Sequence, residues 1–369
     1  MLNTLRYFGW PLATGLLLAL LVIQTVPHWV GLPPNSLSLG DSWAGPVSYA
    51  QAVNRAAPAV ANLYTSKTVA SAGAGKKPLY EQYFQKDGQQ NRIESSLGSA
   101  VIMNAEGYLL TNHHVIAGAE QIVVALRDGR ETVGQLIGTD PETDLAVLKI
   151  DLPNVPVMTV SQIERIRIGD VALAIGNPLG VGQTVTMGIV SATGRNQLGL
   201  NTYEDFIQTD AAINMGNSGG ALVDAHGHLI GINTAILSGG SQGIGFSIPA
   251  NLAVEVMHSI IDEGRVIRGW MGLEVQLLTP ELADSFGIDQ HTGIVVARVY
   301  SKGPADVAGL QAGDVILSID GVPAVDGRSS MNQVARAKPG DVVVIEVLRA
   351  GKTLTLSTTI GVRPPPAKN

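Results

Sequence analysis

A short turn rich in glycine holds the residues of this chain that could best do chemistry. The run Gly216-Asn217-Ser218-Gly219-Gly220 places a serine among glycines, which have no Cβ and let a substrate approach the backbone closely. A serine hydroxyl is a weak nucleophile that needs a general base, an acid to orient the base, and donors for the oxyanion. We predict that Ser218 is the nucleophile and that the N–H groups of Gly216 and Ser218 are the oxyanion donors.

The residues upstream of this turn could supply the base and the acid. The run 111–115 contains two adjacent histidines, His113 and His114, and residue type alone does not choose between them. A histidine titrates near neutral pH, so it can take the serine proton and pass it to the leaving amine. For the acid we prefer Asp144 to Asp140, because Asp144 directly precedes an apolar strand that could hold it rigidly. The order His, Asp, Ser belongs to chymotrypsin-type proteases and predicts a serine protease.

Composition limits the other classes of function. The 369 residues carry a net charge of −7 and no basic run, so we expect no nucleic-acid partner. The sequence contains no cysteine, which excludes disulfides, thiol catalysis and cysteine-based zinc sites. His226 and His228 flank Gly227, and we interpret them as the tip of a hairpin rather than as metal ligands. We therefore expect no metal and no cofactor.

Short apolar runs separated by turns fill the middle of the chain and predict a mainly β protein built from barrels. Pro249 then opens an amphipathic run, which predicts a helix over 252–261 that ends at Gly264. A separate unit begins after Arg265. The main strands predicted before it are 60–64, 99–103, 107–111, 121–126, 145–150, 170–176, 184–190, 229–233 and 245–249.

The N-terminus carries an apolar run from Trp10 to Val30 without Asp, Glu, Lys or Arg. About 20 such residues span the core of a bilayer, and Arg6 favours a cytoplasmic position for the short end. A cleaved signal peptide is the alternative, but we see no clear small-x-small cleavage site. We predict one N-terminal transmembrane helix in a membrane anchor over 1–32, followed by a linker over 33–47.

Taken together, these motifs resemble the HtrA family of serine proteases, and within it the DegS/AlgW type. The resemblance extends from about Ser48 to Val362 and implies that the second histidine, His114, is the base. It also implies a chymotrypsin-like double β-barrel protease domain over 48–262, a C-terminal PDZ domain over 266–363 and a tail over 364–369. The segments that carry it are 111–115 (TNHHV), 143–148 (TDLAVL), 176–180 (GNPLG), 188–195 (GIVSATGR) and 216–222 (GNSGGAL).

The resemblance further assigns residues that control access and activity. The loop formed by Trp270, Met271, Gly272 and Leu273 matches the PDZ loop whose backbone N–H groups hold a peptide carboxylate, and the helix facing the peptide would be 331–335. Trp270 stands where a tyrosine is common, so ligand preference could differ.

Three residues of the protease part bear on activation and specificity. Arg195 matches an arginine of an activation loop that senses the PDZ domain. Asn217 replaces the acid that zymogen-type relatives use, so we expect control by a conformational shift. Ala212 takes the place of the specificity residue and implies a small or aliphatic P1 side chain.

The function implied by this resemblance is a serine endopeptidase anchored by a single pass in the bacterial inner membrane, with its catalytic and PDZ domains in the periplasm. C-terminal peptides of misfolded outer-membrane proteins would activate its first cut in a membrane-spanning anti-sigma factor, which starts the envelope stress response. The resemblance also implies inner-membrane lipid as a partner and a homotrimer, in which Tyr83 and Phe84 could reach a neighbouring subunit. The alternatives are a general periplasmic quality-control protease and a PDZ scaffold or chaperone with little protease activity.

Overall fold

The computed structural model describes residues 14–18, 48–69, 92–161, 166–177, 182–214, 216–236, 243–286 and 293–364. Residues 1–48 and 49–369 form two compact units. Residues 14–18 of the first unit are helical, and no helix in the described ranges is long and apolar enough to cross a membrane. The rest of the predicted anchor and linker, and the loop with Tyr83 and Phe84, lie outside the described residues. The transmembrane helix therefore stays a prediction.

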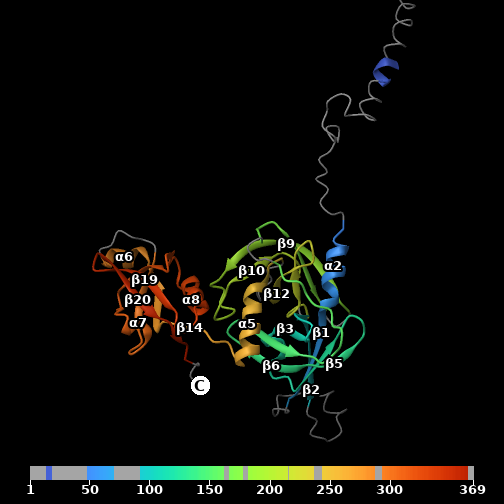
Figure 1. The fold of residues 1–369 in the computed structure, drawn as a ribbon, viewed down its shortest axis with the longest axis horizontal. Coiled ribbons are helices and arrows are strands. Elements are labelled where there is room, and N and C mark those ends of the chain that lie inside the picture. The colour runs from blue at the N-terminus through green and yellow to red at the C-terminus, as the bar shows by residue number, and fades with distance from the viewer. Residues whose placement is uncertain are drawn as a thin grey trace, which may run out of the picture. The chain divides into compact units, whose positions relative to one another are not determined.

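The first part of the second unit folds into one antiparallel sheet of seven strands, in the order β5-β4-β1-β2-β3-β7-β6 (Figure 1). The edge strands β5 and β6 follow one another in sequence with only Gly134 between them. The two edges of this sheet, β5 and β6, are thus connected through Gly134 of the chain and not by hydrogen bonds between paired strands. The bounds are α2 Ala50–Ala56, η2 Ala57–Ala59, β1 Val60–Val69, β2 Arg92–Ile102, β3 Tyr108–Asn112, α4 His113–Ile116, β4 Gln121–Ala125, β5 Glu131–Val133, β6 Gln135–Asp140 and β7 Leu145–Lys149.

The next six strands form a closed barrel in the order β10-β13-β12-β11-β8-β9. Strand β9 is longer than the predicted 184–190, because it pairs with β8 up to Ile189 and with β10 from Val190 to Arg195. Arg195 therefore lies at the end of a barrel strand. The bounds are β8 Val171–Gly176, β9 Thr184–Arg195, β10 Phe206–Thr209, β11 Ala221–Val223, β12 Leu229–Ile236 and β13 Gly245–Pro249.

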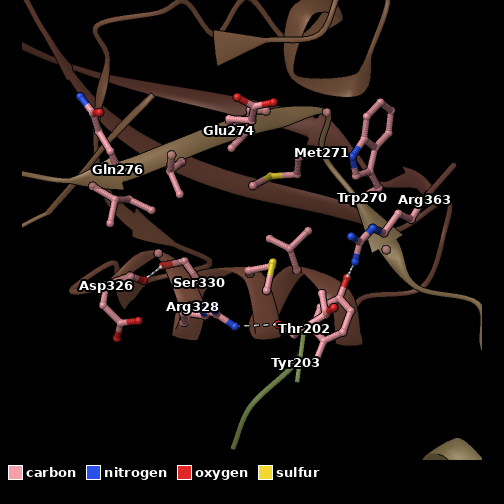
Figure 2. Close-up of a pocket in the computed structure, with 18 of the residues that line it drawn as sticks. Thr202, Tyr203, Trp270, Met271, Glu274, Gln276, Asp326, Arg328, Ser330 and Arg363 are labelled. Atoms are coloured by element: carbon pink, nitrogen blue, oxygen red, sulfur yellow. Dashed lines mark hydrogen bonds between the residues drawn. The ribbon is translucent and has the colours of Figure 1, made fainter. Parts of the chain in front are cut away.

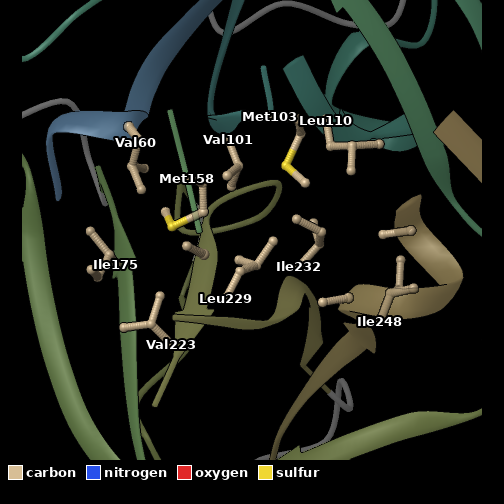
Figure 3. Packing of buried hydrophobic residues seen from close by; sticks show 14 of the residues in the cluster. Val60, Val101, Met103, Leu110, Met158, Ile175, Val223, Leu229, Ile232 and Ile248 are labelled. Carbon is tan, nitrogen blue, oxygen red and sulfur yellow. The ribbon is translucent and has the colours of Figure 1, made fainter. Parts of the chain in front are cut away.

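A common apolar core joins the two sheets. Figure 3 shows Val101 and Leu110 of the first sheet pointing toward the same interior as Val223 and Ile232 of the second. Each fully buried aliphatic side chain contributes about 1.5–3 kcal/mol relative to its exposed state. This shared core sets the position of one sheet against the other. It therefore also positions the site residues that the two sheets carry.

Helix α5 (Ala250–Glu263) confirms the predicted helix and extends it at both ends. It packs against β6 and β7 of the first sheet and against β12 and β13 of the second (Figure 1). Its buried side chains include Ala253, Val256 and Ile260. Gly264 ends the helix with a φ of 71°, a left-handed conformation that glycine adopts without a Cβ penalty.

The C-terminal part is a smaller β unit. Its main sheet has the order β15-β16-β17-β19-β20, and β14 pairs separately with β21. Helix α8 begins at Gly327 and is capped by Asp326, whose side chain accepts a hydrogen bond from the Ser329 N–H at 2.8 Å. The helix includes the predicted 331–335. The bounds are β14 Gly269–Trp270, β15 Leu273–Leu277, α6 Pro280–Phe286, β16 Ile294–Val299, α7 Pro304–Val307, β17 Val315–Ile319, β18 Val322–Pro323, α8 Gly327–Arg336, β19 Val342–Arg349, β20 Lys352–Thr359 and β21 Gly361–Val362.

Candidate active site

Two neighbouring strands of the first sheet bring the candidate base and acid together. The end of β3 pairs with the start of β7, so Asn112 lies opposite Leu145. His114 is the second residue after β3, in the short helix α4, and Asp144 directly precedes β7. Asp144 has a φ of 60°, and its carbonyl accepts hydrogen bonds from the His113 N–H at 3.1 Å and the Asn112 Nδ2 at 3.0 Å. These bonds fix the acid at the mouth of its strand.

The Asp144 carboxylate accepts three hydrogen bonds, two from the candidate base and one from a further residue. Its Oδ2 lies 2.7 Å from His114 Nδ1, and its Oδ1 accepts the His114 N–H at 2.9 Å. Thr234 Oγ1 donates to the same Oδ2 at 2.7 Å. A carboxylate that receives Nδ1–H fixes the imidazole tautomer and leaves Nε2 as the basic nitrogen. Sequence reasoning missed Thr234, because a threonine within an apolar strand carries no local signal.

Ser218 lies in a turn just before β11 of the closed barrel. Its hydroxyl donates to the Thr234 carbonyl at 3.0 Å, and in the described parts of the chain no hydrogen bond joins it to His114. Thr234 thus contacts both the acid, through its hydroxyl, and the nucleophile, through its carbonyl. If Ser218 is the nucleophile, as predicted, its hydroxyl must turn from Thr234 toward His114 Nε2 before attack.

The two rival residues have other environments. The His113 side chain makes no bond to Asp144, and its Nδ1 is buried without a partner among the described atoms. Asp140 binds the guanidinium of Arg268, with 2.9 Å between its Oδ1 and Arg268 Nη1. The structure therefore pairs His114 with Asp144 and places His113 and Asp140 outside that pair.

The backbone of the nucleophile turn has the conformation that its glycines permit. Gly216 and Gly219 have φ values of 96° and 80°. A Cβ at Gly219 would lie 2.2 Å from the Ser99 carbonyl oxygen, so no larger residue fits. Throughout the described ranges, the N–H groups of Gly216 and Ser218 have no hydrogen-bond partner. Both N–H groups can therefore bind a ligand oxygen.

Asn217 links this turn to the residue predicted to line the P1 pocket. Its side chain is 1% exposed, and its Nδ2 donates to the Ala212 carbonyl at 3.3 Å. Thr186 Oγ1 donates to the same carbonyl at 2.8 Å. The amide of Asn217 is thus buried and bonded beside the nucleophile turn.

His226 and His228 lie at the tip of the β11–β12 hairpin, which confirms their interpretation as turn residues. The carboxylate of Asp224 accepts the N–H groups of both, at 2.8 and 2.9 Å. Arg55 of α2 donates to the His226 carbonyl at 3.0 Å. The hairpin tip therefore serves as an attachment point for α2.

A groove of about 1350 Å³ runs along the C-terminal unit between β15 and α8. The predicted carboxylate-binding residues 270–273 line it, together with residues 199–203 of the protease part. Figure 2 shows Trp270 and Arg363 at one end of the groove and Gln276 and Asp326 at the other. A Cβ at Gly272 would lie 3.0 Å from the Trp270 ring, so the indole packs against its own loop. Trp270 therefore supports the shape of the loop.

Comparisons with known proteins agree with both parts of this structure. A trypsin-like peptidase domain model matches residues 98–232, and a PDZ domain model matches residues 269–360. Serine endoprotease DegS of Escherichia coli (strain K12) is 44% identical over 360 residues, which cover 94% of this chain and 96% of the relative. The solved structure of the HtrA-type protease AlgW with a decapeptide is 66% identical with a TM-score of 0.74, and it covers 87% of this chain and 100% of that chain.

This chain belongs to the HtrA-type serine endoproteases. Another relative is the probable periplasmic serine endoprotease DegP-like of Pseudomonas putida (strain W619). It is 42% identical over 332 residues, which cover 85% of this chain and 69% of the relative. The trypsin-like protease and the PDZ domain predicted from the sequence are thus confirmed. Both matched ranges fall inside the predicted domains 48–262 and 266–363, whose boundaries stay predictions.

In this HtrA-type protease, Tyr203 connects the protease and PDZ domains through two arginines. The guanidinium carbon of Arg268 lies 4.4 Å from the centre of the Tyr203 ring, and that of Arg363 lies 5.3 Å from it. Arg363 also donates to the Tyr203 hydroxyl (Figure 2). Both arginines reach Glu142, Arg268 at 3.1 Å and Arg363 at 3.0 Å. Burial raises the pKa of the Tyr203 phenol, although the charge of Arg363 opposes the shift. Tyr203 thus stays neutral beside the arginines at physiological pH.

The groove helix α8 makes direct bonds to residues 196–205 of the protease domain, which we call the receiver segment. Arg328 donates to the carbonyls of Asn201 and Thr202, at 3.1 Å each. Asn332 Nδ2 donates to the Glu204 carbonyl at 2.7 Å. Arg336, Asp205, Asn196 and Ser329 extend these contacts. One wall of the peptide groove is therefore attached to the protease.

Glu204 holds the receiver segment from the protease side. Its side chain is 0% exposed, and its carboxylate accepts the N–H groups of Leu198, Leu200 and Asn201 at 2.7, 2.6 and 3.1 Å. The predicted sensor Arg195 donates instead to Gln208 Oε1 at 2.9 Å within the barrel. The bonds to α8 are made by the residues that follow Arg195. Glu204 gave no signal in the sequence, because an acid in a polar loop is ordinarily exposed.

Proposed function

We propose that this protease hydrolyses peptide bonds with a His114-Asp144-Ser218 triad, and that a peptide C-terminus bound in the PDZ groove raises its activity. The observation that carries the gating part is the set of bonds between α8 and the receiver segment. That segment leads directly into β10, which ends at Thr209, shortly before the predicted specificity residue Ala212. A change at the groove thus has a short covalent route to the substrate site.

The proposed chemistry follows from the positions of the three side chains. Ser218 Oγ attacks the substrate carbonyl while His114 Nε2 takes its proton, and Asp144 stabilises the imidazolium. The N–H groups of Gly216 and Ser218 bind the oxyanion, where one donor is typically worth about 10²–10³ in rate. His114 then protonates the leaving amine, and water, activated by the same imidazole, hydrolyses the acyl-enzyme.

The proposed activator is a peptide that adds as a strand along β15, the first strand in the order of its sheet. Its carboxylate would bind the backbone N–H groups of Met271, Gly272 and Leu273, with Trp270 supporting the loop. Its side chains would press on α8, which carries the bonds to the receiver segment. A ligand shifts such an equilibrium only by its differential affinity for the active arrangement. Arg195, the last residue of β9 and the residue directly before the receiver segment, is proposed to hold the active arrangement through Gln208.

We propose the cellular role from the relatives. The AlgW structure contains a bound decapeptide, and the P. putida relative is described as periplasmic. By analogy, this protease would face the periplasm from an inner-membrane anchor over 1–32 and act as a homotrimer. C-terminal peptides of misfolded outer-membrane proteins would be its activators, and a membrane-spanning anti-sigma factor its substrate.

The test is a titration of peptides with hydrophobic C-termini against the initial rate of cleavage. The parent protein should respond, Arg195→Ala should respond less, and a chain that lacks residues 266–369 should not respond. The same peptides with an amidated C-terminus are the matched control and should have no effect. If a wide panel bound the PDZ domain and left the rate unchanged, the gating proposal would be wrong.

A further inference from the structure

We propose that Ser99 is a positioning residue for the oxyanion site. It lies on β2 of the first sheet, is 0% exposed, and contacts the nucleophile turn of the closed barrel. Both its hydroxyl and its backbone N–H bond to that turn. The inference rests on the oxyanion roles proposed above for Gly216 and Ser218.

The hydroxyl of Ser99 both donates and accepts a hydrogen bond, each with the backbone of a loop. It donates to the Gly216 carbonyl at 2.7 Å and accepts the Asn177 N–H at 3.0 Å. Thr111 Oγ1 in turn donates to the Ser99 carbonyl at 2.7 Å. Because the hydroxyl is bonded on both sides, it cannot rotate without leaving a buried polar group unpaired. Such a loss costs about 1–3 kcal/mol.

Ser99 holds every second peptide plane of the turn. The Gly216–Asn217 plane is bonded at its carbonyl by Ser99 Oγ, and at its N–H by the Asn214 carbonyl at 3.0 Å. The Ser218–Gly219 plane is bonded at its carbonyl by the Ser99 N–H at 2.9 Å. At its N–H it donates to the Asn233 carbonyl at 2.8 Å. Each of these two planes is thus fixed at both ends.

The alternate planes carry the proposed oxyanion donors. Within the described residues, the N–H groups of Gly216 and Ser218 are the ones in this turn that lack partners. Each belongs to a peptide plane that shares a Cα with a plane bonded to Ser99. Fixing a plane restricts the torsions on either side, so Ser99 keeps both free N–H groups aimed without touching the substrate. Such preorganised donors stabilise the charge of the transition state.

The experiment compares Ser99→Ala with the parent in peptide hydrolysis and in the binding of two inhibitors. One is a peptide aldehyde, which forms a tetrahedral adduct with an oxyanion; the other is the same peptide as a carboxamide, which does not. Loss of one oxyanion donor lowers kcat by a factor of about 10²–10³. In Ser99→Ala the donors are present but poorly aimed, so kcat and aldehyde affinity should fall by about tenfold or more. KM and carboxamide affinity should stay within about twofold of the parent, since ground-state contacts are kept.

Two further variants keep the test decisive. Ser99→Cys keeps the branching of the side chain but replaces the hydroxyl by a larger thiol that is only a weak donor, so it should lose kcat to an intermediate degree. Ser318→Ala removes a buried serine hydroxyl of the C-terminal unit, one that is 7% exposed and bonded to Glu346 at 2.7 Å. It should lower the melting temperature without the selective loss of aldehyde affinity. Equal losses for aldehyde and carboxamide, or no loss in Ser99→Ala, would overturn the role of Ser99. Full activity in Ser218→Ala would instead reject the proposed triad.

Discussion

The nucleophile turn and the receiver segment are both held by distant residues, but by different kinds of bond. The turn is bonded by backbone groups, by Ser99, which is 0% exposed, and through the side chain of its own residue Asn217, which is 1% exposed. The receiver segment is bonded to the PDZ domain by the long side chains of Arg328, Arg336 and Arg363, which are 35%, 46% and 33% exposed. Breaking a buried bond leaves an unpaired polar group, whereas an exposed ion pair contributes about 0–1 kcal/mol.

This difference indicates that the nucleophile turn is rigid, whereas the contacts between the receiver segment and the PDZ domain can rearrange. The turn can adopt few other conformations, because each buried group bonded to it would lose its hydrogen-bond partner if the turn moved. Arg328, Arg336 and Arg363 are partly exposed and can exchange protein partners for water at little cost. Arg268 is the exception among the described arginines that contact the receiver segment, because it is buried and bonded to Asp140. Glu204 belongs to the receiver segment, which faces the PDZ domain, but its carboxylate is fully buried like the groups that hold the nucleophile turn. The receiver segment thus combines a fixed protease side with an adjustable PDZ side.

The largest effect is expected for Ser218→Ala, at the centre of the fixed region. Loss of the hydroxyl should reduce kcat by roughly 10⁶, as in other triads, while the melting temperature stays close to that of the parent. Peptide hydrolysis and thermal unfolding measure the two quantities. Activity above about a hundredth of the parent rate would show that another residue attacks.

Next comes the pair of adjacent histidines. His114→Ala should silence the enzyme, because it removes the ring bonded to Asp144 at 2.7 Å. His113→Ala should keep most activity, since its ring makes no bond to Asp144. Rates measured for both variants on one peptide substrate give the comparison. The reverse pattern would overturn the choice of base.

A smaller effect is expected for Glu204→Gln, which probes the fixed side of the receiver segment. An amide cannot accept three N–H bonds as the carboxylate does, so stability should fall by about 1–3 kcal/mol. Activation by peptide should fall, while peptide affinity of the PDZ groove is kept. Urea unfolding, rate titration and fluorescence anisotropy measure the three quantities. Parent-like stability and activation together would show that the segment does not depend on this residue.

The smallest effect is expected for Asp205→Asn, the exposed neighbour of Glu204. Its carboxylate lies 2.8 Å from Arg336 Nη2, with the two side chains 34% and 46% exposed. The variant should lose less than about 1 kcal/mol of stability, and its difference from the parent should shrink at high salt. A loss as large as that of Glu204→Gln would remove the proposed contrast between the two sides.

Local sequence patterns predicted much of this structure. The Ser218 turn, the acid before β7 and the helix that Gly264 ends each depend on neighbouring residues, so a motif or a spacing is enough to find them. Ser99 is 117 residues from Gly216, and Thr234 is 90 residues from Asp144, so their contacts exist only after the sheets have packed. Glu204 binds N–H groups close by in sequence, but only its burial makes that contact important. The closure of the first sheet through Gly134 likewise depends on how the strands pair.

The most direct test of the gating account is amide hydrogen exchange with and without a peptide that binds the PDZ groove. The account predicts that peptide changes the exchange of Leu198, Leu200 and Asn201, whose N–H groups bond to Glu204. Gly219 and Gly220, whose N–H groups bond to Asn233 and Asn217, should keep their protection. A peptide that raises the cleavage rate while exchange at residues 198–201 stays unchanged would contradict the account.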